Sequence, residues 1–357
     1  MSKFSKRLKQ SWKCLFHGLP PVIPAAEPID IFKLLNFAWA GQAIFVATKI
    51  GVLDQLVQGP KSVTDLARLT NADEACLQQV LQALAGCDLL SRDESGRYSF
   101  TPLSESLADK TSWLRRYVMN WGEQYYPAAG NMLEIVKSGR SGFELTHGEA
   151  SWSSIYSRPD DAKLFIDYMS SVTDMQSSAI CGAFDFTPYR QIVDVGGGRA
   201  SLISAVLRAN PHLIGTIVDL PSMKEEAGER IKSEQLADRC TFAGGSFLES
   251  VPASGDVYMI KHVLHDWPDS DVIKILRNIC TAMNENSRLI IVEGVINDLN
   301  GADCVLKLQD LERMFLTGGK GRSQGEFGAL LELAGLRLEE IRHTAVMDCS
   351  LIIVRKK

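Results

Sequence analysis

The feature that most constrains the fold is a regular alternation of β-branched runs and helical patterns after Pro188. Strands are predicted at 191–195, 214–219, 240–243, 257–260, 288–293 and 345–354. Helices are predicted between them at 202–208, 223–236, 270–283 and 323–334. Strands that alternate with helices form parallel pairs, so the pattern predicts an α/β fold. We expect a doubly wound, Rossmann-like sheet with a parallel majority over residues 185–357.

The preceding part of the chain carries helical patterns and one hairpin. Helices are predicted from about residue 29, near 63–69 and at 74–87, and two short strands at 89–92 and 98–101 flank a turn. This order is typical of a winged helix, for which DNA binding is the first alternative. The second helix has no lysine or arginine, however, and the chain has a net charge of −5. We therefore predict a winged-helix interaction module over 29–105, a homodimer and no nucleic-acid partner.

Residues 1–28 form a basic arm. Apolar residues recur there at helical spacing among five lysines and arginines, and no acid precedes Glu27. Such a segment can lie on a membrane surface or pack on a partner subunit; we favour a loose arm or a subunit contact and expect no stable membrane anchor. The chain has no run of 18 apolar residues and no secretory signal pattern, and its eight cysteines form no CxxC pair. These features predict reduced thiols and a cytoplasmic protein.

Residues 106–184 are expected to be helical and are rich in aromatic and methionine side chains, among them Trp121 and Met169. Core packing is the simpler explanation for any one of them. As a set they could line an apolar pocket for a planar, aromatic small molecule. Trp121 and Met169 are therefore candidate substrate-binding residues in a helical linker and pocket region.

The glycine triplet 196–198 follows the first predicted strand, where ligands bind in open α/β sheets. Glycines let the backbone approach a ligand closely, and Asp219, at the end of the second strand, could accept both ribose hydroxyls of a nucleoside. The triplet matches neither GxGxxG nor GxxxxGK, so pyrophosphate binding is poorly supported. A tight strand–helix turn without a ligand is the alternative.

Five motifs in order give this chain a specific resemblance: DVGGG at 194–198, VDLP at 218–221, GSFLESVP at 245–252, KHVLHDWPD at 261–269 and GGKGRS at 318–323. From about residue 34 to the C-terminus the sequence resembles the S-adenosylmethionine-dependent small-molecule O-methyltransferases, of the caffeate, hydroxyneurosporene and acetylserotonin type. The resemblance implies a Rossmann-like catalytic domain, an N-terminal winged-helix dimerisation domain, S-adenosylmethionine as cofactor and no metal.

Residue by residue, the resemblance implies two groups of site residues. His265 falls on the general base and Glu293 on the carboxylate that braces it. Gly196 would contact the methionine part of the cofactor and Asp219 the ribose. The remaining implied contacts are Ser246 and Phe247 beside the adenine, Lys261 on the cofactor, and Asp266 at the border of cofactor and acceptor.

The chemistry of the histidine fits that role. A phenol has a pKa near ~10 and a histidine near ~6.5, so a placed histidine can accept the phenolic proton while a carboxylate fixes its tautomer. A capping or core histidine is the structural alternative for His265. His262, three residues earlier, is expected to point elsewhere.

Three departures from the family pattern bear on the reaction. Arg199 and Ala200 replace the usual Thr-Gly, Ser246 replaces an acid, and Gly321 stands at the position of a second glutamate beside the histidine. Two enzymatic hypotheses therefore stay open: O-methylation of a small aromatic natural product, or a decarboxylation, hydroxylation or pericyclic reaction by a relative that only binds the cofactor. The sequence does not name the methyl acceptor or distinguish oxygen from nitrogen, sulfur or carbon.

Overall fold

The computed structural model describes residues 28–148, 157–253, 255–297 and 304–357. The described residues form two compact units: a larger one within 128–157 and 172–357, and a smaller one with residues 28–127 together with 158–171. The basic arm predicted over 1–28 lies almost wholly outside the described residues. The helical segment predicted over 106–184 contributes to both units, and the predicted boundaries at 28, 105 and 184 remain predictions.

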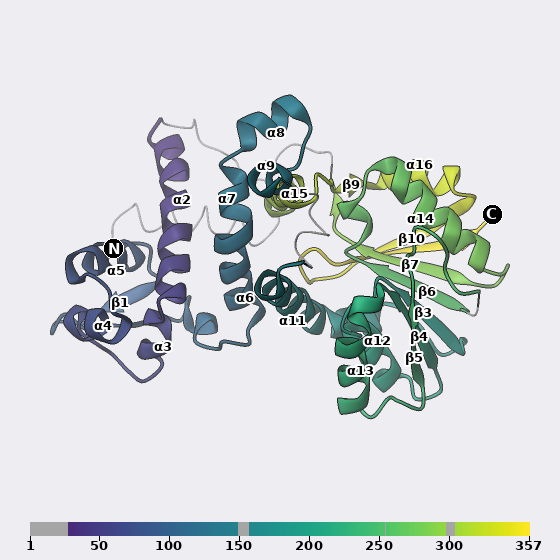
Figure 1. Cartoon of the computed structure of the whole chain (residues 1–357), viewed down its shortest axis with the longest axis horizontal. Helices are drawn as coiled ribbons and strands as arrows, with labels where there is room; N and C mark the ends of the chain where they lie inside the picture. Colours follow the sequence, from purple (N-terminus) through teal and green to yellow (C-terminus); the bar gives the residue numbers. More distant parts are fainter. Residues whose placement is uncertain (1–27, 149–156, 254, 298–303) are drawn as a thin grey trace. The chain divides into compact units, whose positions relative to one another are not determined.

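The larger unit is built on a seven-stranded sheet with the order β10-β11-β7-β6-β3-β4-β5 (Figure 1). The last five strands in that order are parallel to one another, and β11 and β10 continue the sheet antiparallel beyond β7. This confirms the predicted Rossmann-like architecture. The strands are β3 (Gln191–Val195), β4 (Ile214–Asp219), β5 (Cys240–Gly244), β6 (Val257–Lys261), β7 (Arg288–Glu293), β10 (Leu336–His343) and β11 (Ser350–Lys356).

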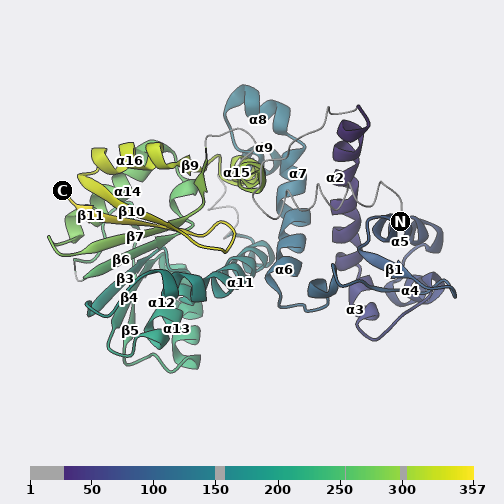
Figure 2. The ribbon, with the colours of Figure 1, turned by 180° about the vertical axis from the view of Figure 1, so that it is seen from behind.

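Helices cover both faces of this sheet (Figure 2). Side chains alternate along a strand, so Ile192 of β3 joins one apolar core and Val193 the other. The first core lies against α12 (Ser201–Ala209), α13 (Lys224–Ser233) and the end of α11 (Pro159–Ala183). The second lies against α14 (Asp269–Ala282) and α16 (Gln324–Leu333). The unit also contains α8 (Met132–Ser138), α9 (Gly142–His147), α15 (Cys304–Leu316), the short turns η3 (Pro221–Met223) and η4 (Leu264–Asp266), and the parallel pair β8 (Val295–Ile296) and β9 (Arg322–Ser323).

The strand predicted over 345–354 is wrong at its beginning, because the structure has a turn at 344–349 and starts β11 at Ser350. The partner strand β10 was not predicted. It is an edge strand with the sequence LRLEEIRH, and its charged, largely accessible side chains leave no apolar run. The seven cysteines among the described residues are all free, as expected.

The smaller unit starts with α2 (Pro28–Lys49) and α3 (Val52–Leu56), and its core is formed mainly by leucines of α3, α4 (Val63–Thr70) and α5 (Glu74–Gly86). Ser62 and Asp73 accept hydrogen bonds from the backbone N–H groups of Asp65 and Cys76 and so cap α4 and α5. The antiparallel hairpin of β1 (Leu90–Arg92) and β2 (Tyr98–Phe100) follows. This is the predicted order of elements, while the winged-helix assignment itself stays a prediction. The unit continues with η1 (Glu105–Leu107), α6 (Trp113–Asn120), η2 (Trp121–Tyr125) and the start of α7 (Tyr126–Ala129).

Helix α2 is apolar on nearly all sides. Ala43 and Ala47 are buried in the unit, whereas Leu34 and Leu35 are 71% and 67% exposed. Residues 31–49 are also long and apolar enough to span a membrane by length and composition, which was not expected from the sequence. The small residues of α2 do let another helix approach: a Cβ on Gly41 would lie 3.0 Å from the Trp121 ring.

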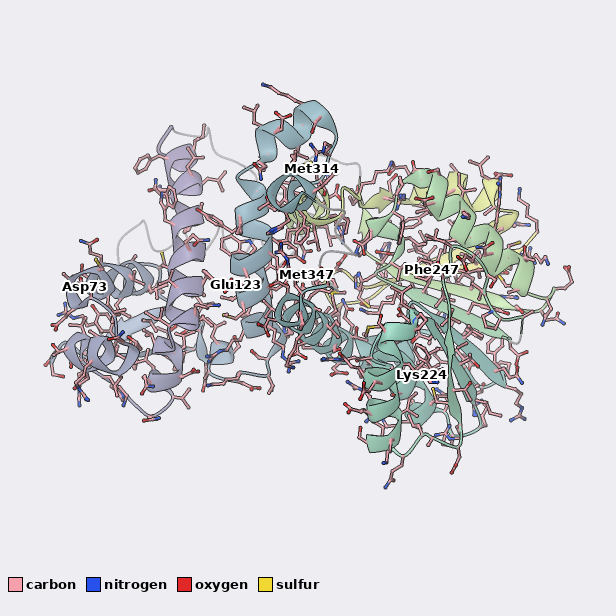
Figure 3. All side chains as sticks on the ribbon, in the orientation of Figure 1. Asp73, Glu123, Lys224, Phe247, Met314 and Met347 are labelled. Carbon is pink, nitrogen blue, oxygen red and sulfur yellow. The ribbon has the colours of Figure 1, made fainter. Side chains whose placement is uncertain are left out.

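Segment η2 is a π-helical turn between α6 and α7. A Cβ at Gly122 would overlap the ring of Phe45 on α2, so only glycine fits there without movement. Beside this contact, the Lys49 ammonium forms an ion pair with the carboxylate of Glu123, which is labelled in Figure 3. The π-turn is thus held against α2 by a close backbone approach and an ion pair.

We expect Gly122→Ala to lower the free energy of unfolding by about 1–3 kcal/mol, because the new methyl group must displace Phe45. Gly86→Ala is the matched control: it is also helical, and nothing lies within 4 Å of the position that a Cβ would take there. The control should be neutral or stabilising, by up to about 1 kcal/mol. Urea denaturation followed by circular dichroism measures both, and equal effects of the two substitutions would contradict the packing described here.

Candidate active site

The carboxyl ends of the parallel strands meet at one edge of the sheet, and the predicted cofactor and catalytic residues of the larger unit gather there. They come from the ends of five neighbouring strands, as expected for ligand binding in an open α/β sheet. They are Gly196 after β3, Asp219 at the end of β4, Ser246 and Phe247 after β5, Lys261 at the end of β6 with His265 and Asp266 after it, and Glu293 at the end of β7.

The glycine loop is tied to the end of β4. Asp219 accepts hydrogen bonds from the backbone N–H groups of Gly198 and Leu220, both at 2.7 Å. Gly196 has φ +73°, and a Cβ there would lie 2.8 Å from a methyl group of Val263. Burial raises the pKa of Asp219, although the two N–H groups oppose this. The loop therefore needs glycine and presents a largely buried carboxylate beside it.

Asp194, the last-but-one residue of β3, is a buried acceptor with an unused oxygen. It is 2% exposed, and its Oδ2 has no hydrogen-bond partner among the described residues. Burial, followed by the nearby Asp219, raises its pKa to about 7. A buried polar atom without a partner is costly, so a ligand that brings a donor to this point would be favoured. The unused acceptor fits a nucleoside cofactor with a charged amino group.

Arg199 and Ala200, which depart from the family pattern at the end of the glycine loop, are both accommodated by the structure. The Arg199 side chain forms an ion pair with Glu226 on α13, which balances its charge. Ala200 is fully buried and has φ +65°, a left-handed conformation that glycine adopts more easily. The loop thus keeps the turn despite the replacement of the usual glycine.

Phe247 and Ser246 lie next to this loop, after β5. A Cβ on Gly196 would lie 3.7 Å from the ring of Phe247, which is labelled in Figure 3. The Phe247 ring also packs edge-on against Trp267, with 6.0 Å between the ring centroids. The Ser246 hydroxyl accepts a hydrogen bond from the backbone N–H of Leu248 at 3.3 Å, so it shapes the turn. Its O–H can still donate to a ligand.

His265 and Glu293 form a close pair. The histidine Nδ1 lies 2.5 Å from Glu293 Oε2, and Glu293 Oε1 accepts from the backbone N–H groups of Leu264 and His265 at 3.1 and 3.4 Å. Burial alone would lower the pKa of His265, but the carboxylates of Glu293 and Asp266 raise it overall. Burial alone would raise the pKa of Glu293, but the nearby His265 lowers it overall. An ionised Glu293 that accepts from Nδ1–H leaves Nε2 as the basic atom.

Asp266 and Lys261 flank the pair. Asp266 Oδ1 lies 3.7 Å from His265 Nε2, and burial raises the pKa of this carboxyl to about 6. The Lys261 ammonium donates to the Thr173 hydroxyl at 3.1 Å, and burial lowers its pKa to about 8. Both groups can therefore change protonation within reach of neutral pH.

The glycine-rich segment 318–323 holds the histidine turn in place. A Cβ on Gly319 would overlap the His265 carbonyl, and the Lys320 N–H donates to that carbonyl at 2.9 Å. The Arg322 guanidinium, 1% exposed, donates to the carbonyls of Leu264 and Trp267 at 2.8 Å. No role for Arg322 was predicted from the sequence; its place in the GGKGRS motif was the available signal.

The space beside Gly321, where the resemblance implies a second acid, is filled. A Cβ there would overlap the Ile296 side chain, and the Gly321 N–H donates to the carboxylate of Asp310 on α15. Position 321 therefore supplies no second acid to His265. The carboxylate that lies near Nε2 of His265 belongs to Asp266.

The expectation that His262 points elsewhere is wrong. Its ring lies 5.4 Å from that of His265, and its Nδ1 is 3.8 Å from Glu293 Oε2. Its Nε2 lies 3.3 Å from Gln176 Oε1. Burial, and then the nearby cations, hold its pKa well below the ordinary value, so the ring is neutral. The pKa values of the two histidines are thus shifted in opposite directions: burial lowers that of His262, and the carboxylates of Glu293 and Asp266 raise that of His265 overall.

The ligand atoms of His262, His265 and Glu293 lie within 4.8 Å of one another, a grouping that the sequence did not predict. Two atoms that bind one tetrahedral metal at ordinary bond lengths lie about 3.3 Å apart. His265 Nδ1 and Glu293 Oε2 lie only 2.5 Å apart, too close for two ligands of one metal ion. We therefore assign no metal ligands among the described residues.

The candidate substrate residues Trp121 and Met169 belong to the smaller unit. Trp121 lies in the π-turn, with its ring 5.2 Å from that of Tyr126, and Met169 is a half-buried residue of α11. Their contact with an acceptor remains a prediction.

Comparisons with known proteins agree with this arrangement. The O-methyltransferase domain family matches residues 130–337, and the O-methyltransferase dimerisation domain matches 32–110. The mitomycin biosynthesis 6-O-methyltransferase of Streptomyces lavendulae is 37% identical over 88% of this chain and 90% of its own length. The phenazine O-methyltransferase PhzM of Lysobacter antibioticus is 32% identical over 88% and 92%.

Solved structures show the same fold. The mitomycin 7-O-methyltransferase MmcR superposes with a TM-score of 0.87 at 35% identity, over 92% of this chain and 97% of that one. The neocarzinostatin enzyme NcsB1, solved with S-adenosylmethionine and 2-hydroxy-5-methyl naphthoic acid, gives 0.75 at 26% identity over 89% and 96%. With both domains matched and relatives aligned over nearly nine-tenths of its length, this chain belongs to the O-methyltransferase family, as an enzyme with a Rossmann-like catalytic domain and a dimerisation domain.

Proposed function

We propose that the protein transfers a methyl group from S-adenosylmethionine to a phenolic hydroxyl of a small aromatic natural product, with His265 as the general base. The observation that carries the proposal is the hydrogen bond between His265 and the buried Glu293. Relatives of this chain are named for mitomycin biosynthesis, for phenazine and for 2,7-dihydroxy-5-methyl-1-naphthoate, which supports a small aromatic acceptor.

S-adenosylmethionine, the cofactor of this family, supplies a methyl group on a sulfonium. Asp219 is placed to accept from ribose hydroxyls, and the free oxygen of Asp194 can accept from the amino group of the methionine part near Gly196. Phe247 and Ser246 offer a ring and a hydroxyl for the adenine. Lys261 supplies a donor at the end of β6.

The proton chemistry belongs to this chain's own residues. His265 Nε2 would accept the proton of the acceptor hydroxyl, and bound S-adenosylmethionine would supply the methyl group that this oxygen takes up. Glu293 holds the ring in the tautomer with Nδ1–H and stabilises the imidazolium that results. Asp266, Trp121 and Met169 are the proposed acceptor contacts. A cytoplasmic location and the absence of nucleic-acid binding remain predictions.

The same proposal includes a homodimer formed mainly by residues 1–100. Five large apolar side chains of α2 that are more than 60% exposed would be covered by a second copy: Ile31, Phe32, Leu34, Leu35 and Trp39. The match to a dimerisation domain over 32–110 supports the second copy as the partner, rather than a membrane. An obligate interface of this kind should bury more than ~2,000 Å².

Asp219→Ala should weaken binding of S-adenosylhomocysteine by roughly 1.5–3 kcal/mol, the range for a hydrogen bond to a charged group. Asp256→Ala is the matched control, because Asp256 also accepts two backbone N–H groups, from Arg190 and Gln191, but at the opposite end of β3. Calorimetry measures both affinities. An unchanged affinity in Asp219→Ala would remove the ribose assignment.

His265→Ala should lower turnover by roughly 10²–10⁴-fold, the usual contribution of a placed general base, with little change in cofactor affinity. Glu293→Gln should cause a smaller loss, because it keeps the shape but not the charge. The wild-type rate should rise with pH through the pKa of His265 and then level off. The carboxylates of Glu293 and Asp266 raise that pKa, so the midpoint of the rise should lie on the alkaline side of the ordinary pKa of a histidine.

The assay is the mass of the product of candidate aromatics, read for one added methyl group alongside the rate. Melting curves with and without cofactor confirm that each variant folds. Near-normal turnover of His265→Ala would refute the general-base role, and a product without the added methyl would refute methyl transfer.

The double substitution Leu34→Glu/Leu35→Glu should convert the dimer to a monomer at micromolar concentration, because it places two charges on the apolar face of α2. Leu333→Glu, at a 58%-exposed leucine of α16, is the control and should leave the dimer intact. Light scattering gives both masses. A monomeric wild-type protein would overturn the proposed assembly.

A further inference from the structure

A buried ion pair that the mechanism above does not use lies behind the base. The Arg313 guanidinium on α15, 8% exposed, places Nη2 3.1 Å from both carboxylate oxygens of Asp348. Asp348 belongs to the turn between β10 and β11 and has φ +55°. Their neighbours Met314 and Met347 are labelled in Figure 3. We call these two residues the Arg313–Asp348 pair.

The pair connects to Glu293 over short distances. Glycine at 294, the residue after Glu293, makes room for Asp348, because a Cβ there would overlap the Asp348 carboxylate. Asp348 Oδ2 lies 3.6 Å from Nδ1 of His262, and the same nitrogen lies 3.8 Å from Glu293 Oε2. Gln176 holds the other side of this histidine and donates to the Met347 carbonyl at 3.0 Å. The Arg313–Asp348 pair therefore lies directly beside His262 and the end of β7, where Glu293 is located.

Stability does not explain such a pair. Removing an arginine and an aspartate from water costs several kcal/mol per ion, and an apolar pair of similar volume is often as stable. Within the pair, the Arg313 guanidinium places a positive charge near the carboxylates of Glu293 and Asp266. Arg313 lowers the pKa of Glu293 and of His265, both after larger effects of burial and of closer partners.

We propose that Arg313 and Asp348 are positioning residues for the reaction: the Arg313 charge, held in place by Asp348, keeps Glu293 ionised without letting His265 remain protonated. This inference rests on the proposed function, in which His265 must be the free base. Without the guanidinium, the carboxylates around His265 would hold its proton more tightly. Without Asp348, the guanidinium would act on the histidine with less compensation.

All charged or titratable groups around His265 enter this balance. They come from each element packed against it: Glu293 of β7, Asp266 of η4, Lys261 and His262 at the end of β6, Arg313 and Asp310 of α15, and Asp348 of the β10–β11 turn. The Arg313–Asp348 pair can be removed from this set without touching a group placed at the cofactor or the reacting atoms.

The test measures the titration of His265 directly by NMR. The full-length protein carries [¹³Cε1]-histidine and is saturated with S-adenosylhomocysteine, and the His265 signal is assigned by its loss in His265→Asn. We expect Arg313→Met to raise the pKa of His265 and Asp348→Asn to lower it. The double variant removes one positive and one negative charge at neighbouring positions, so their opposite Coulomb effects on His265 should largely cancel and its pKa should lie near the wild-type value.

Arg288→Met is the matched control. Arg288 forms a 2.7 Å ion pair with Glu339 at the opposite end of β7 from Glu293, so this variant makes the same change of charge at a distance from the base. It should leave the titration of His265 unchanged. Arg313→Lys keeps the charge and should stay close to the wild type.

An unchanged titration in both single variants, or shifts in the same direction, would overturn the proposal and leave the pair a structural contact. If Arg313→Met does not fold, the direction of the shift in Asp348→Asn and its reversal in the double variant decide the matter. The measurement needs no methyl acceptor. If the two single variants shift the pKa of His265 in opposite directions but the protein transfers no methyl group, the proposed role of the Arg313–Asp348 pair stands. Only the proposed reaction is then overturned.

Discussion

A single buried carboxylate, Glu293, determines how the edge of the sheet is built. It is 1% exposed, and an ionised carboxylate at such a place is costly unless its oxygens are satisfied. One oxygen accepts from two successive backbone N–H groups and the other from His265. The chain must therefore turn sharply after β6, as it does in η4, and other parts of the molecule must hold that turn. Arg322 does so by binding carbonyls on both sides of it.

The parallel strands could be predicted from the sequence, because strands covered on both faces are continuous β-branched runs. The ends of these runs also predict that Asp219, Lys261, His265 and Glu293 meet at one edge of the sheet. The resemblance to a family supplied the roles, which spacing alone does not give. Strand β10 escaped prediction because an edge strand needs no apolar run, and its charges are equally typical of a loop.

The contacts around the base could not be predicted for a different reason. Arg313 and Asp348 lie 35 residues apart and meet only because α15 packs beside the turn that follows β10. His262 follows a buried strand in a left-handed conformation, with φ +51°, and so its direction does not follow from its spacing to His265. Helix α2 presents a similar limit: when nearly every side is apolar, periodicity does not indicate which face is packed and which is left for another molecule.

The π-turn η2 has a consequence for how this part of the family can vary. A π-turn contains one residue more than the α-helical turn it replaces. Loss of one residue would restore a regular helix, and every later side chain of that helix would rotate by about 100° about the axis. The direction of Trp121 and of the aromatic residues that follow it is thus controlled by chain length as well as by residue type. In this segment, insertions and deletions of single residues offer a route to a differently shaped surface that point substitutions alone do not provide.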